Sequence, residues 1–171
     1  MQLINVDKTT YKKRLNLISV VLVGALAVLA IGFGSLLIAL FGAPSVSGES
    51  TGNFHLNLIG VIGAALVCAA ALSRLKHTAY FIEVYYVWRL KALQNRIYRK
   101  VKTIKQRANE NDRDAIVVLY FYYHSLKQVY SLDNNTLTLP ELEKNIQALQ
   151  QQIDSLGIQV NVEDFDTSLI K

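Results

Sequence analysis

The chain is poor in cysteine and proline, with one cysteine, Cys68, and two prolines among 171 residues. A single cysteine excludes a disulfide framework within one chain and a cysteine-based metal cluster, so the sequence fits a reducing compartment or indifference to redox state. No glycine or proline occurs between Gly63 and Pro140. Long helices are therefore expected to run through that part of the chain.

Charged side chains and histidines are absent from two apolar runs, residues 15–41 and 56–72. Ionisable groups inside a membrane usually mark a pathway for ions or protons. Their absence argues against a transporter or channel that works alone.

Both runs are candidate membrane spans. The first comfortably exceeds the roughly 20 residues that a helix needs to cross a hydrocarbon core of about 30 Å. The second lies at the lower limit, and Phe54 and the later aromatics can complete it. The alternatives are a cleaved signal peptide, whose apolar region is typically only about 7–15 residues, and, for the second run, a buried helix of a soluble protein.

Small residues occur along both runs, with Gly24 and Gly32 in the first and Gly60, Ala64 and Cys68 four residues apart in the second. Such a stripe lets two helix backbones approach closely. We interpret it as packing of the two spans on each other; dimerisation through the stripe is the alternative.

The segment between the runs, residues 42–53, is rich in Gly, Ser and Pro and is predicted to be a hairpin loop. It has no Lys or Arg, whereas "KKR" precedes the first run and "RLK" follows the second. This asymmetry predicts that both termini lie in the cytoplasm.

The net charge of +5 is unevenly distributed. Residues 74–107 hold ten Lys and Arg and one Glu, giving +9, and residues 108–171 hold ten acids and four bases, giving −6. A chain whose basic and acidic residues are separated in this way is expected to contact two different partners.

Residues 74–108 are predicted to form one amphipathic helix that continues from the second span. Its apolar stripe comprises Leu90, Leu93, Ile97, Val101, Ile104 and Ala108. Its basic face comprises Arg89, Arg96, Arg99, Lys100, Lys102, Lys105 and Arg107.

Aromatic residues precede this basic face, notably Tyr80, Phe81, Tyr85, Tyr86 and Trp88. Such rings are typical of a membrane–water interface, and nearby Lys and Arg attract anionic lipid headgroups. The alternatives are a solvated face that only sets topology, and a nucleic-acid surface. Because no known nucleic-acid motif accompanies the charge, we expect membrane lipid as the partner and no nucleic acid.

The remaining chain, residues 109–171, is predicted to form a helical hairpin and a C-terminal arm. Asn111 or Asp112 is expected to cap a helix over 115–132, although its β-branched and aromatic content also suits a buried strand. Thr138 and Glu141 are expected to form a capping box for a helix over 139–155, which Gly157 ends. A helix-packing seam is predicted at Leu142, Ile146, Leu149, Ile153 and Leu156.

This seam is expected to fold back on the preceding helix, or else to pair with another chain. Residues 158–162 alternate in polarity, which predicts a short strand or an extended arm, and the final residues are expected to be loose.

Catalytic and metal sites are not expected. His55, His77 and His124 are scattered, and the stretch after Asp133 lacks the ligand pattern and glycine of a calcium loop. Eight tyrosines between residues 80 and 130 suggest ligand stacking, but their helical spacing favours core and interface positions. We therefore expect no cofactor and no enzymatic activity.

Three stretches, "NFHLNLIGVIG", "YFIEVYYVWRLKALQNRIYRK" and "FYYHSLKQVYSLDNNTLTL", resemble a family of small bacterial inner-membrane proteins catalogued as domain of unknown function 3087. The resemblance covers nearly the whole chain. It implies two spans and a cytoplasmic helical tail, and it brings no catalytic residue or cofactor with it.

The predicted fold is an all-α membrane protein, a two-span transmembrane helical hairpin followed by a cytoplasmic helical tail. The expected segments are 1–14 (cytoplasmic), 15–41 (first span), 42–53 (extracytoplasmic loop), 54–73 (second span), 74–108 (juxtamembrane helix) and 109–171 (tail). We expect a scaffold or accessory subunit of the bacterial inner membrane, with a protein partner or a homo-oligomer. The alternative is a subunit of a transport or envelope-biogenesis complex, which would need ionisable residues from its partner.

Overall fold

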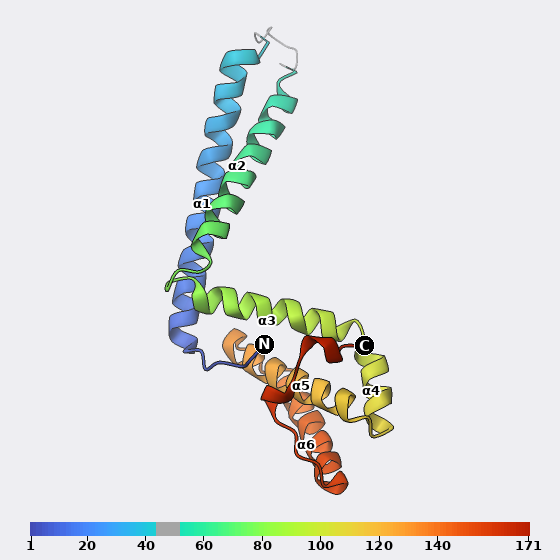
Figure 1. Cartoon of the computed structure of the whole chain (residues 1–171). Coiled ribbons are helices and arrows are strands. Elements are labelled where there is room, and N and C mark those ends of the chain that lie inside the picture. Colours follow the sequence, from blue (N-terminus) through green and yellow to red (C-terminus); the bar gives the residue numbers. More distant parts are fainter. Residues whose placement is uncertain (44–51) are drawn as a thin grey trace. The chain divides into compact units, whose positions relative to one another are not determined.

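The computed structural model describes residues 1–43 and 52–171, and over these residues it contains six α-helices, two short 3-10 helices and no strand. Figure 1 shows their order along the chain. The bounds are α1 Lys8–Phe41, α2 Phe54–Leu75, α3 Ile82–Tyr98, α4 Val101–Asn109, α5 Arg113–Asp133, α6 Leu139–Leu156, η1 Val162–Asp164 and η2 Thr167–Leu169. The predicted all-helical class is confirmed. Most of the predicted loop over 42–53 lies outside the described residues.

The chain forms two compact units. The apolar unit comprises Lys13–Ile82, and the helical unit comprises Met1–Lys12 together with Glu83–Lys171. The first residues of the chain therefore belong with its last half. This association of the first residues with the helical unit was not predicted. The sequence pattern identifies residues 1–14 only as a segment before the first span.

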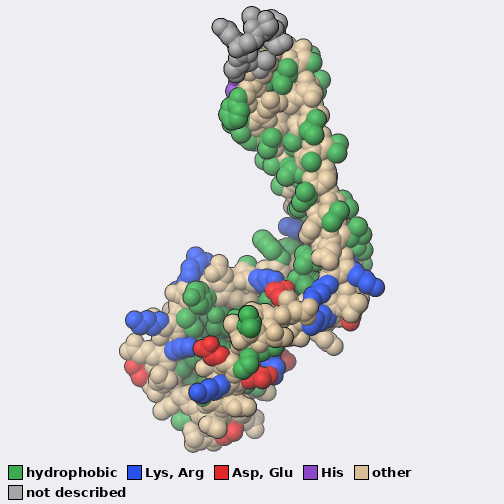
Figure 2. Space-filling model, turned by 180° about the vertical axis from the view of Figure 1, so that it is seen from behind, with side chains coloured by type: hydrophobic (Ala, Val, Ile, Leu, Met, Phe, Trp, Pro, Cys, Tyr) green, Lys and Arg blue, Asp and Glu red, His purple; other side chains and the backbone are tan. Residues whose placement is uncertain are grey.

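Among the residues that the structure describes, two helices are long and apolar enough to cross a membrane, α1 and α2. Only 6% of the most apolar stretch of α1 and 22% of that of α2 is buried. A core helix of a soluble protein would hide most of such a surface from water. Figure 2 shows hydrophobic side chains along the outside of this unit.

The two helices of the apolar unit approach each other at small residues. A Cβ atom on Gly60 of α2 would lie 2.6 Å from the backbone nitrogen of Gly34 of α1. The buried residues of α2 recur every four positions, at Leu56, Gly60, Ala64 and Cys68. The predicted stripe on the second span thus packs against the first span. Gly24 and Gly32 take no part, because a Cβ there would meet nothing within 4 Å.

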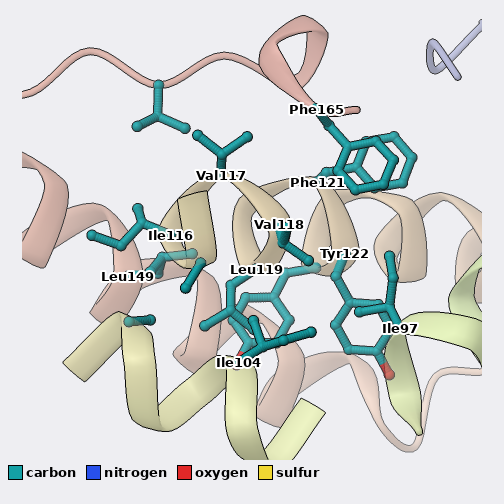
Figure 3. Close-up of a cluster of buried hydrophobic side chains, with 14 of the residues drawn as sticks. Ile97, Ile104, Ile116, Val117, Val118, Leu119, Phe121, Tyr122, Leu149 and Phe165 are labelled. Carbon is teal, nitrogen blue, oxygen red and sulfur yellow. The ribbon is translucent and has the colours of Figure 1, made fainter. Parts of the chain in front are cut away.

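The predicted continuous helix over 74–108 is wrong. The chain leaves helical geometry after Leu75, where the Thr78 hydroxyl donates a hydrogen bond of 2.8 Å to the Leu75 carbonyl oxygen. A second break falls at Arg99 and Lys100, between α3 and α4. This break changes the chain direction, so that Ile97 of α3 and Ile104 of α4 reach one core from different helices (Figure 3).

Helix α5 forms the centre of the helical unit, and both α4 and α6 pack against it. Figure 3 shows Ile116, Val118 and Phe121 pointing to different sides of α5, and all three are buried. Burial on nearly every side explains the β-branched and aromatic composition, which by itself also suited a strand. Helix α5 joins α3 through a buried hydrogen bond of 3.1 Å, which Gln94 Nε2 donates to Ser125 Oγ.

The ends of α5 and α6 follow the expected chemistry in part. The Asp112 carboxylate caps α5 by accepting from the backbone N–H groups of Asp114 and Ala115. Thr138 stands at the N-cap of α6, but its side chain makes no capping hydrogen bond, so the predicted capping box with Glu141 is wrong. Gly157 ends α6 with a φ of 62°, a left-handed conformation that glycine adopts without strain.

The C-terminal arm is packed, which contradicts the prediction of loose final residues. The Phe165 ring stacks on the Phe121 ring of α5 with centroids 3.9 Å apart (Figure 3). Val160 and Ile170 are also buried. Residues 158–161 are not a strand, and η1 and η2 follow them. The alternating polarity therefore belongs to an arm whose apolar side chains are buried at intervals against α5.

Candidate functional site

The outward face of α3 combines aromatic and basic side chains. At 100° per residue, Tyr85, Trp88, Arg89 and Arg96 of α3 fall within an arc of about 100°, and Arg99 follows in the turn directly after the helix. The buried residues of α3 lie on the other side: Val87, Leu90, Leu93, Gln94 and Ile97. Because packing against the core fixes the buried side, the outward set has a defined direction within the helical unit. We call these five outward residues the α3 outer face.

Trp88 is the most unusual member of the α3 outer face, since 65% of its surface is exposed. The Tyr85 ring stacks on Trp88 with centroids 6.0 Å apart and an interplanar angle of 18°. The Arg89 guanidinium lies 5.9 Å from the centre of the Tyr85 ring. The face is thus a small aromatic platform with cations beside it, a chemistry suited to a surface that is apolar inside and anionic outside.

The other predicted basic residues divide into separate groups, because the helix breaks at Arg99 and Lys100. Lys102 and Lys105 are exposed on α4. The Lys100 ammonium donates to the carbonyl oxygen of Ile170, at 3.5 Å. The predicted single basic face is therefore wrong, because its cations do not share one helix.

Arg107 has a structural contact instead of an outward position. Its Nε donates to the Asp112 carboxylate at 2.8 Å, and its Nη2 contacts the same oxygen. The hydrogen bond from Arg107 is the main cause that lowers the pKa of Asp112 below its ordinary value. Arg107 thus fixes the turn between α4 and α5.

The predicted interfacial aromatics also separate. Tyr80 and Phe81 lie in the turn after α2, within the apolar unit, and their rings meet edge to face. The Arg14 guanidinium of α1 lies 5.3 Å from the centre of the Tyr80 ring and donates to the Ala79 carbonyl oxygen at 3.3 Å. Arg14 therefore ties α1 to the turn that ends the second apolar helix.

Tyr86 points into the helical unit, away from the α3 outer face. Its hydroxyl accepts a hydrogen bond from the Ile4 backbone N–H and donates one to the Gln128 side chain. Burial raises the pKa of Tyr86 above its ordinary value, so its phenol stays protonated and can donate at neutral pH. This contact with the N-terminal segment was missed from sequence, and only the apolar Val6 and Tyr11 near the segment hinted at burial.

The predicted helix-packing seam on α6 is mostly buried against α5. Leu142, Leu149 and Ile153 are buried and Ile146 packs beside them, whereas Leu156 is 37% exposed. The seam therefore lies within one chain over its first three turns and ends before Leu156.

No metal site occurs among residues 1–43 and 52–171, because no group of three or more His, Cys, Asp or Glu residues could hold an ion there. The three histidines stay apart. The His124 ring, for example, hydrogen-bonds through Nδ1 to the Tyr120 carbonyl oxygen of its own helix, at 2.9 Å.

Comparison with known proteins gives one assignment. No curated protein and no solved structure matches the chain. A family model described as "Protein of unknown function (DUF3087)" matches residues 1–170, which is nearly the entire sequence. The chain therefore belongs to the DUF3087 family.

Proposed function

We propose that the protein is a non-enzymatic integral membrane scaffold or accessory subunit whose α3 outer face binds anionic lipid. In this proposal α1 and α2 cross the bacterial inner membrane as a hairpin, and both termini lie in the cytoplasm. The helical unit then serves as a tail that binds a partner protein or a second copy of the chain.

The exposed Trp88 is the observation that supports the proposal best. A tryptophan that is 65% exposed leaves a large apolar ring in water, whereas at the headgroup level the ring is buried and its N–H stays hydrated. Tyr85 stacks beside it, so the two rings would enter the interface together.

Arg89, Arg96 and Arg99 supply the electrostatic part of the proposed contact. Each cation near an anionic membrane surface contributes on the order of 1 kcal/mol. Two arginines on α3 and one in the turn after it would therefore add a firm attraction to the burial of the aromatic rings. The attraction between exposed charges is screened by salt, so it should weaken as ionic strength rises.

The single tryptophan of the chain makes this contact measurable in the whole protein. The full-length protein would be placed in lipid nanodiscs whose lipids carry bromine at the top of the acyl chain. We expect Trp88 emission to be quenched, more strongly with phosphatidylglycerol than with phosphatidylcholine. Raising the salt concentration should reduce the difference between the two lipids.

Two matched triple variants separate local from general charge effects. Changing Arg89, Arg96 and Arg99 to Gln should abolish the preference for anionic lipid. Changing Arg113, Lys127 and Lys144 to Gln removes the same charge elsewhere on the unit and should leave the preference intact. Two results would contradict anionic-lipid binding by the α3 outer face. One is equal quenching of the wild-type protein in phosphatidylglycerol and phosphatidylcholine. The other is an equal lipid preference in the two triple variants.

The proposed topology has its own test. With Cys68 replaced by Ala, a cysteine at position 47 should react with an impermeant maleimide added to intact spheroplasts. A cysteine at position 109, at the end of α4, should react only after lysis. The reverse pattern would overturn the orientation that the Lys and Arg asymmetry favours.

The tail's proposed role in assembly is tested by cross-linking in native membranes followed by affinity capture. A stoichiometric second protein would support an accessory subunit, and complexes of this chain alone would support a self-assembling scaffold. Recovery of the monomer alone at every cross-linker concentration would contradict both forms of the role.

A further inference from the structure

A pocket in the helical unit is lined by four tyrosines together with charged, polar and apolar side chains. Tyr98 of α3, Tyr122, Tyr123 and Tyr130 of α5, Lys105 of α4 and Glu141 of α6 contribute to its walls. The cavity has a volume of about 210 Å³. Pockets for drug-sized ligands measure roughly 300–1,000 Å³, so an occupant here would be smaller, about the size of an amino acid.

Two hydroxyl groups in this pocket have no hydrogen-bond partner among the described residues. Tyr122 and Tyr123 are each only 7% exposed, and within residues 1–43 and 52–171 neither hydroxyl makes a hydrogen bond. No fully enclosed side-chain oxygen of the described residues is left unpaired. The two hydroxyls therefore still meet solvent, and the pocket that they line is where they do so. Figure 3 shows Tyr122 extending past Ile97, with its hydroxyl at the far end from α5.

A phenol whose ring is buried usually has a hydrogen-bond partner for its hydroxyl, and here only the contents of the pocket can supply one. The ring of Tyr122 fills core space that phenylalanine would fill equally well, so packing does not explain its hydroxyl. Burial, together with the nearby hydroxyls of Tyr130, Tyr123 and Tyr98, raises the pKa of Tyr122 to about 12. The hydroxyl is therefore neutral at physiological pH and is able both to donate and to accept a hydrogen bond.

The charges of the pocket are opposite and unpaired. Lys105 and Glu141 do not form an ion pair with each other or with any other described residue. A ligand with one charge would be attracted by one of these side chains and repelled by the other. A ligand that carries both charges would satisfy the two side chains together.

We propose that this pocket binds a small zwitterion with one ammonium group and one carboxylate or phosphate group. Lys105 and the tyrosine hydroxyls contact the anionic group, and Glu141 contacts the ammonium group. The same chemistry occurs in a free amino acid and in a phosphoethanolamine lipid headgroup, and the experiment distinguishes these sources.

The test uses the full-length protein in a neutral maltoside detergent, with binding followed by saturation-transfer NMR and calorimetry. The probes are L-serine, glycerophosphoethanolamine, inorganic phosphate and ethanolamine. We expect L-serine or glycerophosphoethanolamine to bind, and phosphate and ethanolamine to bind much more weakly. Preference for L-serine indicates a soluble ligand, and preference for glycerophosphoethanolamine indicates a lipid headgroup.

Tyr122→Phe removes one hydroxyl and keeps the ring, so it should weaken binding of the preferred probe roughly tenfold, the usual effect of losing a hydrogen bond to a charged group. Tyr120→Phe, on the same helix but outside the pocket, is the matched control and should bind normally. Lys105→Gln and Glu141→Gln alter exposed side chains, so they remain informative if Tyr122→Phe is poorly folded.

Three results would overturn the proposal. The first is that neither zwitterion binds to the folded wild-type protein. The second is that phosphate or ethanolamine alone binds as tightly as the preferred zwitterion. The third is that the affinity of that zwitterion is unchanged in both Lys105→Gln and Glu141→Gln.

Discussion

The Tyr86 hydroxyl accepts a hydrogen bond of 3.1 Å from the backbone N–H of Ile4, 82 residues away in the sequence. Gln128 closes a ring with these two residues. Its side-chain oxygen accepts from the Tyr86 hydroxyl at 3.2 Å, and its amide nitrogen donates to the Ile4 carbonyl oxygen. Two of these hydrogen bonds hold the N-terminal segment against α3 and α5, and the third joins α3 to α5 within the helical unit.

Tyr86→Phe should loosen this segment, because it removes the group that bridges Ile4 and Gln128. A hydrogen bond of this kind contributes about 0.5–1.5 kcal/mol to the free energy of unfolding. We expect faster hydrogen exchange at the Ile4 amide, measured by mass spectrometry of the detergent-solubilised protein. Tyr98→Phe alters an exposed tyrosine that makes no hydrogen bond to the described part of the chain, so it should leave the exchange rate unchanged.

Gly60→Ala should destabilise the contact between α1 and α2. The new Cβ would lie 2.6 Å from the Gly34 backbone nitrogen and 2.9 Å from its Cα, so the helices must separate. Overpacking of this kind typically costs about 1–3 kcal/mol, which thermal unfolding in detergent can detect. Gly32→Ala is the matched control, because its Cβ meets nothing within 4 Å. Equal unfolding temperatures for the two variants would show that the glycine contact is not formed.

Asp112→Ala should lower the free energy of unfolding by about 1–2 kcal/mol, the usual effect of removing a helix N-cap. Asp112→Asn keeps an N-cap acceptor for α5 but loses the ion pair with Arg107, so it should cost less. Urea unfolding followed by circular dichroism measures both differences. Asp114→Ala, which breaks only an exposed ion pair with Lys171, is the control and should change stability little.

The Asp112 contribution should depend on pH in one direction. The folded protein lowers the pKa of Asp112 below its ordinary value of 3.8, so the carboxylate stabilises the fold at any pH above that value. This stabilisation disappears as the pH falls from 3.8 through the lower folded pKa. The stability difference between wild type and Asp112→Ala should therefore be constant near neutral pH and shrink in acid. A difference that grows in acid would contradict the assignment.

The helices that could be predicted from sequence have a signal within their own residues. Hydropathy marks α1 and α2, and a regular apolar spacing with Gly157 at its end marks α6. Asp112 marks the start of α5 for the same reason, because its capping bonds reach only two and three residues along the chain. Features that depend on residues close together in the chain can be recognised in a sequence without knowledge of the tertiary contacts.

The features that escaped prediction depend on distant contacts. The break at Arg99 and Lys100 contains no glycine or proline, and it is favoured because Ile97 and Ile104 then bury their side chains in one core. The stacking of Phe165 on Phe121 and the attachment of the N-terminal segment likewise join residues far apart in the chain. The pocket lined by Tyr122 and Tyr123 is another example, because it forms only when α3, α4, α5 and α6 come together. The helical spacing of the tyrosines by itself favours core positions.

Leu149→Asp tests whether the seam of α6 packs within one chain. Leu149 is buried against α5, so a carboxylate there would lie in an apolar environment without a partner. We expect a loss of roughly 3 kcal/mol or more in the free energy of unfolding, and early proteolysis between α5 and α6.

The matched control is Leu156→Asp, at the exposed end of the same stripe, which should cost less than about 1 kcal/mol. Size-exclusion chromatography with light scattering gives the oligomer size of each variant in detergent. Because the seam contacts α5 of its own chain, the size should be the same for Leu149→Asp and wild type. An oligomer that dissociates in Leu149→Asp while the tail still resists protease would show instead that the seam joins two chains.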